Sequence, residues 1–388
     1  MGETLAAARR LAPRFAARAE GYDRTGSFPV DDFADLRAAG LFGLMVPERL
    51  GGMGAGFADY AAVAYELSRG NGATALVFNM HASVTGALAA VTEELAAAFG
   101  LPAEALAARD RLLRTAAEGA WYAVAMSERG VGSRLSQLST MYDTVDGGYH
   151  IKGSKTFVSG AGHPDGYLVA ARSSAAPDLV SQFVVPSTLD GLVVEETWDS
   201  LGMRATSSHD LHIDAVVPAD ALLGGVEGLA LIVAQIAPHW LVASYAAVYV
   251  GVAQSAVDAA VEHLGKRGLA HLPAVRARVG RADAAVAAVK LVVDEAARRV
   301  DAAPGEAETN RWVWRAKLLA GTTAMDVAAS MLEASGTSAS RRGHPLERLY
   351  RDARCGSLQP ATSDVCADWL GIATLGGDPD QDGSAPRW

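Results

Sequence analysis

The chain has 388 residues, of which 50% are hydrophobic, 7% aromatic and 20% charged, and its formal net charge is −10. At about 100–200 residues per domain, this length predicts two or three domains. The apolar share excludes a disordered chain, and two cysteines in such a length exclude a disulfide scaffold. An acidic balance without a Lys/Arg run argues against nucleic acid or a membrane surface as a partner.

Local features narrow the location and the chemistry further. Residues 1–20 carry charges throughout and contain no apolar run of a secretory signal, so we expect a cytoplasmic protein. Cys355 and Cys366 lack both CxxC spacing and a histidine cluster, which predicts buried thiols and no metal site. Residues 228–257 contain no charged side chain, but Pro238 and scattered polar residues interrupt them. This pattern predicts a buried helix broken near Pro238 rather than a membrane span.

Hydrophobic periodicity divides the chain into three regions. Residues 1–115 place apolar side chains at helical spacing, interrupted by the glycine-rich stretch 40–56. From about 120 to 220 the period becomes two, as in antiparallel strands that follow one another along the chain. The strand candidates are 149–159, with a Gly-Ser turn inside it, 167–172, 181–186, 191–197 and 210–218. From about 225 to 372 helices return, with the longest expected over 274–300 and 311–335.

Several motif-like patterns have a structural interpretation. GGMGAG (51–56) lacks the flanking strands of a dinucleotide site, and GSKT (153–156) lacks the glycine that a phosphate loop has before its lysine. Both are therefore predicted to be turns. No Gly-x-Ser-x-Gly elbow supports a hydrolase. Four histidines are isolated in sequence, which favours hydrogen-bonded structural roles: His81, His163, His209 and His239.

Five segments resemble those of acyl-CoA dehydrogenase flavoproteins, in the same order and with similar spacing. They are FPVDDFADLRAAGLFGLMVPERLGGMG (28–54), AMSERGVGSR (125–134), GSKTFVSGAG (153–162), SLGMRATSSHDLHIDAVVP (200–218) and HPLERLYRDAR (344–354). Each segment is a weak signal alone, but their shared order over residues 28–372 is specific.

The resemblance implies an α+β fold built from three domains. We expect an N-terminal helical domain (1–118), a middle antiparallel β domain (119–222), a C-terminal four-helix bundle (223–373) and a flexible tail (374–388). It also implies FAD as the cofactor and a homodimer or homotetramer, because the family shares its flavin between neighbouring bundles.

The chemistry of two segments suits a flavin. A flavin ring needs backbone amides and small hydroxyls at its polar edge and a flat apolar wall. By the resemblance, the ring would be lined by Val124, Met126, Ser127, Gly132, Ser133, Phe157, Val158 and Ser159. Ser133 would also lie near the substrate, and Arg267 and Thr362 would complete the cofactor contacts. The alternative is a serine-rich hairpin surface.

The catalytic base is where this chain departs from the family. Acyl-CoA dehydrogenases use a carboxylate to take the α-proton while the β-hydrogen leaves as hydride. The usual Glu follows the Arg-Asp-Ala motif, where this chain has Pro360, and the alternative position falls in the charge-free run. The catalytic residue is therefore unknown, with Glu333, Asp364 and His239 as displaced candidates.

Three functions remain open. The resemblance favours FAD-dependent α,β-dehydrogenation of an acyl thioester, linked to CoA or a carrier protein, with a displaced base or an unusually acidic substrate. The alternative is a flavin monooxygenase that uses reduced flavin and oxygen and needs no such base, although the His often found there is Gln359 here. The third is a flavin-binding protein without turnover. An electron acceptor or a flavin reductase would be the redox partner.

Overall fold

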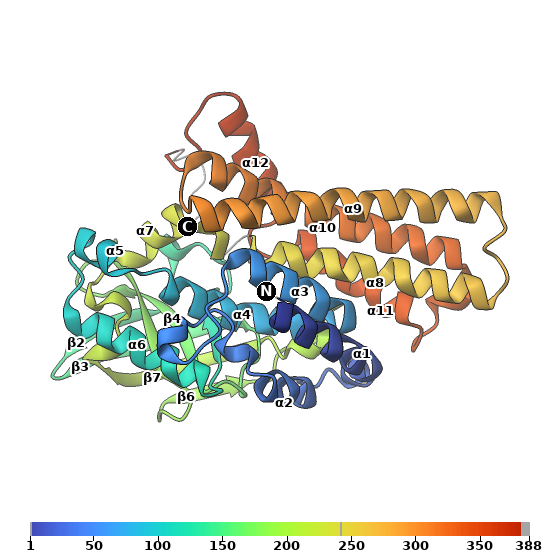
Figure 1. Ribbon diagram of the computed structural model, residues 1–388. Helices are drawn as coiled ribbons and strands as arrows, with labels where there is room; N and C mark the ends of the chain where they lie inside the picture. Colours follow the sequence, from blue (N-terminus) through green and yellow to red (C-terminus); the bar gives the residue numbers. More distant parts are fainter. Residues whose placement is uncertain (1, 241–242, 382–388) are drawn as a thin grey trace.

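The computed structural model describes residues 2–240 and 243–381, and it begins with the expected helices (Figure 1). These are α1 (Gly2–Thr25), α2 (Val30–Ala38), α3 (Phe57–Gly70), α4 (Gly72–Ala89), α5 (Glu93–Ala98) and α6 (Ala103–Ala117). Side-chain caps fix two of the starts: Asn71 accepts from the Ala73 N–H before α4, and Thr92 accepts from the Leu95 N–H before α5. The stretch 51–56 is a turn and bend, as predicted.

The middle region is one seven-stranded sheet with the order β1-β4-β2-β3-β7-β6, and β5 pairs with β4. Its strands are β1 (Tyr122–Ala125), β2 (Met141–Val145), β3 (Gly148–Val158), β4 (Gly166–Ser173), β5 (Val180–Pro186), β6 (Leu192–Glu195) and β7 (His209–Pro218). The five expected strands are present as β3 to β7. The short strands β1 and β2 were not among the candidates, because four or five residues show little alternation.

Two expectations for the sheet are wrong. The sheet is mixed, because β4 pairs in parallel with both β1 and β2, while the other pairs are antiparallel. Alternation identifies a strand but carries no information on its direction. The expected Gly-Ser turn at GSKT (153–156) is also absent, since β3 continues through it and its pairing with β7 becomes irregular only after Lys155. Gly153 instead allows a close approach, because a Cβ there would overlap Thr140.

Long helices then form a bundle that extends away from the sheet (Figure 1). They are α7 (Leu229–Ile236), α8 (Ser244–Lys266), α9 (Pro273–Ala302), α10 (Ala307–Ser335), α11 (Pro345–Arg354) and α12 (Ser363–Thr374). Helices α8, α9, α10 and α11 make the bundle, and α3 packs against α8 and α9. Gly251 permits this packing, because a Cβ there would overlap Ser68 of α3. The two long helices expected over 274–300 and 311–335 are confirmed as α9 and α10.

The charge-free run is broken near Pro238, as expected. Pro238–Trp240 forms a 3-10 turn between α7 and α8, and Leu241 and Val242 lie outside the described residues. In the described part of the chain, one stretch, Pro238–Lys266, is long and apolar enough to cross a membrane. However, 88% of the most apolar part of this stretch is buried inside the protein. The run therefore behaves as a core helix.

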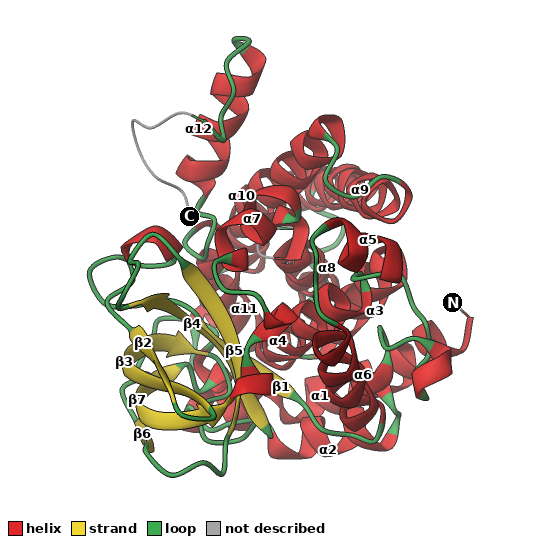
Figure 2. Cartoon of the chain, turned by 90° about the vertical axis from the view of Figure 1, so that its left-hand side faces the viewer, coloured by secondary structure: helices red, strands yellow, loops and turns green. Residues whose placement is uncertain are grey.

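The sheet lies to one side of the helices, and α12 projects beyond both (Figure 2). The larger hydrophobic core joins the N-terminal helices, the sheet and the bundle. A smaller core joins α4, α6 and α7 to β1, β4 and β5. Of the predicted tail, residues 382–388 lie outside the described residues, and Asp380 accepts a 3.1 Å hydrogen bond from the Trp369 indole N–H of α12.

Candidate functional site

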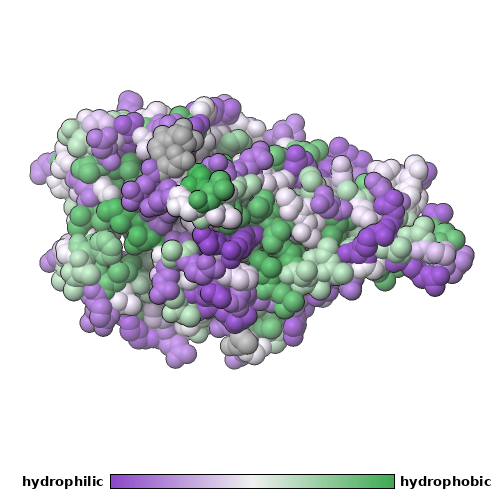
Figure 3. Space-filling view, turned by 90° about the horizontal axis from the view of Figure 1, so that it is seen from above, coloured by the Kyte–Doolittle hydropathy of each residue, from purple (hydrophilic) through white to green (hydrophobic). Residues whose placement is uncertain are grey.

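A cavity of about 330 Å³ lies beside the smaller core, between α4, α5, α6, the sheet and α7. Val124 of β1 and Met126 directly after it line the cavity, as do Leu168 of β4 and Gln182 of β5. Its volume is that of a pocket for a small organic molecule. Five of its lining residues are also large exposed apolar residues: Leu95, Phe99, Ile232, Val233 and Ile236. Figure 3 shows hydrophobic surface over the end of the molecule that carries α5 and α7, so the cavity has an apolar mouth.

The cavity wall offers little charge. The residues that line it include no Asp or Glu, and the two residues outside the described part of this segment are Leu and Val. Arg109 is its single cation, and this guanidinium already donates to the Asp110 carboxylate and the Val91 carbonyl. The Ser83 hydroxyl donates to the Asn79 carbonyl at 2.8 Å. The remaining polar side-chain groups of the wall are the Gln182 amide, which lies 4.0 Å from the Met126 sulfur, the His239 imidazole and the indole N–H of Trp240.

His239 differs from an ordinary structural histidine. It is 2% exposed, and its Nδ1 has no hydrogen-bond partner among the described residues. Its ring meets Phe57 edge-on at 5.5 Å and lies 5.0 Å from Trp240. Burial lowers the pKa of His239 to about 4, so the imidazole is neutral and weakly basic. The expectation of a hydrogen-bonded structural role is therefore wrong for His239.

The two predicted flavin segments lie side by side at the ends of β1 and β3. The Thr156 N–H donates to the Ser127 carbonyl at 2.8 Å, which places the loop after β1 next to Phe157. Phe157 is 61% exposed, has a φ of 57°, and meets Trp198 edge-on at 6.1 Å. Within the described residues the hydroxyls of Ser127 and Ser133 make no hydrogen bond. An exposed aromatic face beside free hydroxyls suits the ring of a flavin.

The Ser159 hydroxyl belongs to a chain of hydrogen-bonded hydroxyl groups, and the donor of each hydrogen bond in this chain can be derived. Thr206 donates to the Met203 carbonyl at 2.9 Å, so Ser208, 2.7 Å from Thr206, must donate to it. Ser159, 2.9 Å from Ser208, must in turn donate to Ser208. The single proton of Ser159 is thereby used, and its oxygen remains available only as an acceptor.

A buried ion pair fixes the loop after β1. Lys155 of β3 donates to Glu128 at 2.7 Å, and both side chains are almost fully buried. Burial raises the pKa of Glu128, but Lys155 and the hydrogen bonds from Ser139 and Thr140 outweigh it and lower that pKa to about 2. This pair was not predicted from the sequence, although its members lie inside two of the five segments, 125–134 and 153–162.

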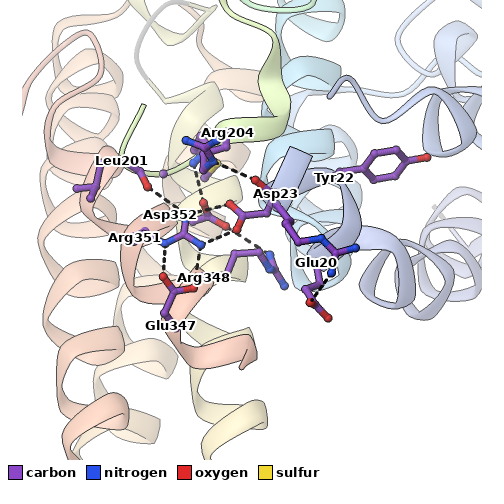
Figure 4. Close-up of polar contacts among 12 residues, drawn as sticks. Glu20, Tyr22, Asp23, Leu201, Arg204, Glu347, Arg348, Arg351 and Asp352 are labelled. Carbon is purple, nitrogen blue, oxygen red and sulfur yellow. Dashed lines mark hydrogen bonds and ion pairs between the residues drawn. The ribbon is translucent and has the colours of Figure 1, made fainter. Parts of the chain in front are cut away.

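The segment between β6 and β7 is fixed by α11 and α1 (Figure 4). The Arg351 guanidinium donates to the Asp23 carboxylate at 2.9 and 2.5 Å, to Glu347 at 2.7 Å and to the Leu201 carbonyl at 3.1 Å. Asp352 accepts from the Met203 N–H at 2.6 Å. Two of the five segments, 200–218 and 344–354, therefore bind each other.

The structure groups most of the predicted cofactor residues. Val124 and Met126 reach the cavity, whereas Phe157 lies at the end of β3, and Ser127, Gly132, Ser133 and Ser159 belong to the adjoining loops. The Val158 side chain is buried in the main core, so only its backbone can face a ligand.

The remaining predicted residues lie apart from this group. The Thr362 hydroxyl accepts from the Val365 N–H and caps α12. Arg267, in the loop at the far end of the bundle from the sheet, donates to Ser338 at 3.0 Å (Figure 1). Among the candidate bases, Glu333 is exposed and paired with Arg278 at 2.6 Å, and Asp364 is exposed in the first turn of α12. His239 alone of the three lines the cavity.

A helical domain, a β domain with an aromatic and hydroxyl cradle, and a helical bundle define a class of flavoproteins. The models of the acyl-CoA dehydrogenase N-terminal, middle and C-terminal domains match residues 3–105, 123–216 and 243–362. The chain belongs to the acyl-CoA dehydrogenase family and is a flavoprotein of that fold, as the resemblance implied.

The relatives catalyse different reactions. The chain is 31% identical to L-evernosamine nitrososynthase of Micromonospora sp., covering 95% of this chain and 89% of the relative. It is 26% identical to the 3-(aryl)acrylate reductase of Clostridium sporogenes, covering 92% and 94%. A solved structure of KijD3 with FMN and a dTDP-linked amino sugar is 27% identical, has a TM-score of 0.83, and covers 97% of this chain and 95% of that one.

Proposed function

We propose that the protein is a flavin-dependent monooxygenase that receives reduced flavin and inserts one oxygen atom of O2 into a small organic substrate. The observation that carries the proposal is the cavity wall without a carboxylate. Dehydrogenation of a thioester requires a base over the α-carbon, and an imidazole with a pKa of about 4 is too weak for that proton. Oxygen insertion from reduced flavin requires no such base.

The reaction balances without a further co-reactant. Reduced flavin supplies two electrons when bound, one oxygen atom enters the substrate, and the other leaves as water with two protons. A nitroso group carries oxygen on nitrogen, so the similarity to a nitrososynthase supports oxygenation.

The chain's own residues hold the reactants and exclude water. Ser159 presents an acceptor oxygen, which suits a reduced flavin because that form carries an N–H where oxidised flavin has a bare nitrogen. Phe157 supplies an aromatic wall, and Val124 and Met126 supply apolar lining of the cavity. FAD, as opposed to FMN, remains part of the proposal, as do the cytoplasmic location and the homo-oligomer.

The test supplies the purified protein with flavin, a flavin reductase and NADH, and measures oxygen uptake and hydrogen peroxide release with a panel of small aromatic compounds. We expect a compound that lowers peroxide release while an oxygenated product accumulates. Ala90→Trp, at an exposed position that lines the cavity, should abolish product formation by blocking entry.

Two results would speak against the proposal. The control is Ala38→Trp, the same substitution at an exposed position of α2 away from the cavity, which should leave product formation unchanged. Equal losses of product in Ala38→Trp and Ala90→Trp would contradict the role of the cavity. Anaerobic bleaching of the bound flavin by an acyl thioester would favour the dehydrogenase, and stable flavin binding without either reaction would favour a binding protein.

A further inference from the structure

The start of α11 is held by a hydrogen-bonded pair of histidines whose proton positions can be derived. His344 precedes α11, and its Nδ1 accepts from the Leu346 N–H at 3.2 Å. A backbone N–H can only donate, so Nδ1 carries no proton and Nε2 of the neutral ring carries one. This Nε2 therefore donates to Nδ1 of His263 on α8, 3.0 Å away. His263 in turn has its proton on Nε2, which lies 3.4 Å from the Ser338 hydroxyl.

The pair has no place for another proton, because both Nδ1 atoms accept a hydrogen bond and both Nε2 atoms already carry hydrogen. A proton added to Nδ1 of His344 faces the Leu346 N–H, so the cap of α11 is lost. A proton added to Nδ1 of His263 faces the N–H of His344, so the two rings separate. A positive charge at the start of a helix is also unfavourable, because the helix dipole is positive there.

The charged groups around the pair do not compensate an added proton. Arg267 faces the pair through the Ser338 hydroxyl, to which it donates at 3.0 Å, and Arg341 and Arg342 lie in the exposed loop before it. The carboxylates that α1, α8, α10 and α11 carry at this end of the bundle are paired with arginine or lysine: Glu20, Asp23, Glu262, Glu333, Glu347 and Asp352. Among the described residues, none of them forms an ion pair with either histidine.

Helix α11 connects the pair to the flavin cradle. It continues from the pair to Asp352, whose carboxylate accepts from the Met203 N–H at 2.6 Å (Figure 4). The Met203 carbonyl accepts from Thr206, the first hydroxyl of the chain that ends at Ser159. A displacement of α11 therefore reaches the cradle through consecutive hydrogen bonds.

We propose that His263 and His344 form a pH-sensitive switch, in which the neutral rings hold the start of α11 against α8 and one added proton releases it and loosens the flavin cradle. Burial and the neighbouring His263 ring lower the pKa of His344, so the unfolded or released state binds the proton more readily. The contact is thus complete above a pH of about 6.5 and is lost as pH falls below it. The switch does not depend on which reaction the flavin performs.

Hydrogen exchange on the full chain with flavin bound tests the switch directly. Exchange in the first turn of α11, which contains the Leu346 amide, is measured at about pH 7.5 and about pH 5, on either side of an ordinary histidine pKa. Dividing by the rate of the unfolded chain at the same pH removes the intrinsic effect of pH. We expect protection to fall about fivefold at the lower pH, the usual effect of a lost helix cap.

Two variants isolate the pair from other histidines. His344→Asn keeps a side-chain oxygen for the Leu346 N–H and does not titrate, so protection should stay high at both pH values. His271 lies in the loop after α8, but its Nδ1 bonds the Gly268 carbonyl at 2.8 Å and so already carries a proton. A second proton on Nε2 leaves that bond intact, and His271→Asn should keep the wild-type response. Constant wild-type protection, or an equal fall in His344→Asn, would overturn the proposal.

Fluorescence titration of flavin tests the connection to the cradle. Between the same two pH values, the dissociation constant should rise up to about fivefold more in the wild-type protein than in His344→Asn, since proton uptake and flavin release are linked. An equal rise in both proteins would overturn the connection. Neither measurement needs turnover, so a protein that shows the switch without any oxygenation would refute the proposed function alone, and oxygenation without the switch would refute this proposal alone.

Discussion

His81 and His239 show how differently two buried histidines can behave. His81 bonds the Phe42 carbonyl through Nε2 at 2.8 Å and accepts from the Tyr122 N–H through Nδ1 at 3.1 Å, which confirms its structural role. His239 has a similar burial without a described partner for Nδ1. The sequence presented both as isolated histidines, because the partners of His81 lie about forty residues away along the chain.

At the residue scale, the histidines make stability depend on pH. Burial lowers the pKa of His81 to about 4 from an unfolded value of 6.5, so the unfolded chain binds more protons between these values. The free energy of unfolding should be constant for this group above pH 6.5 and fall as pH drops toward 4, by about 3 kcal/mol in total. Chemical denaturation between these pH values measures the slope.

The matched variants for this prediction are His81→Asn and His271→Asn. His81→Asn should reduce the slope but not abolish it, because the pKa of His239 is also lowered to about 4. His271 is exposed, and its variant should keep the wild-type slope. A wild-type slope in His81→Asn would contradict the argument from burial.

Phe157 tests the flavin cradle. Its ring is 61% exposed, so Phe157→Ala should change the free energy of unfolding by less than about 0.5 kcal/mol. Loss of an aromatic wall should raise the dissociation constant of the flavin about tenfold, which fluorescence titration measures. Val193→Ala removes a similarly exposed apolar side chain from β6 and should change neither value. A large loss of stability with unchanged flavin affinity would make Phe157 structural.

At the element scale, α11 positions the segment between β6 and β7. Gly202 lies so close to α11 that a Cβ there would overlap the Arg351 carbonyl oxygen. Met203 and Ser207 have φ values of 53° and 44°, a conformation that is costly outside glycine and is retained where the surroundings enforce it. The hydrogen bonds of Arg351 and the Asp352 carboxylate hold the segment in this conformation (Figure 4).

Removing the arginine should therefore loosen this segment. Arg351→Met leaves the buried Asp23 carboxylate and the half-buried Glu347 carboxylate unpaired and should lower the free energy of unfolding by about 3–5 kcal/mol in chemical denaturation. Hydrogen exchange should quicken at the Thr206 amide. Lys266→Met breaks an exposed pair with Glu262 and should cost less than about 1 kcal/mol. Equal effects of the two substitutions would contradict the role assigned to the cluster.

The elements themselves were largely predictable from local pattern. Helical spacing identified α9 and α10, and alternation identified β3 to β7, because both signals lie within consecutive residues. The parallel pairing of β4 was not predictable, since β1 and β2 reach it from distant parts of the chain. The Glu128–Lys155 pair was missed for the same reason, as its members are 27 residues apart.

At the scale of the whole molecule, the resemblance of five segments predicted the domain order, and the family models confirm it. The cavity was not predictable, because its wall combines residues from Ser83 to Gly305 on many elements. Arg267 lies at the far end of the bundle from the flavin cradle of its own chain (Figure 1). Its predicted cofactor contact thus requires a second subunit and remains a prediction.

The central claim is that reduced flavin and O2 act on a substrate held in a cavity without a carboxylate. The most direct measurement is mass spectrometry of the products formed from the panel of small aromatic compounds under isotopically labelled O2, with reduced flavin supplied by a reductase. We predict that the product gains one labelled oxygen atom and that Ala90→Trp prevents it. A protein that incorporates no label under these conditions, and whose flavin is instead bleached by an acyl thioester without oxygen, would contradict the claim.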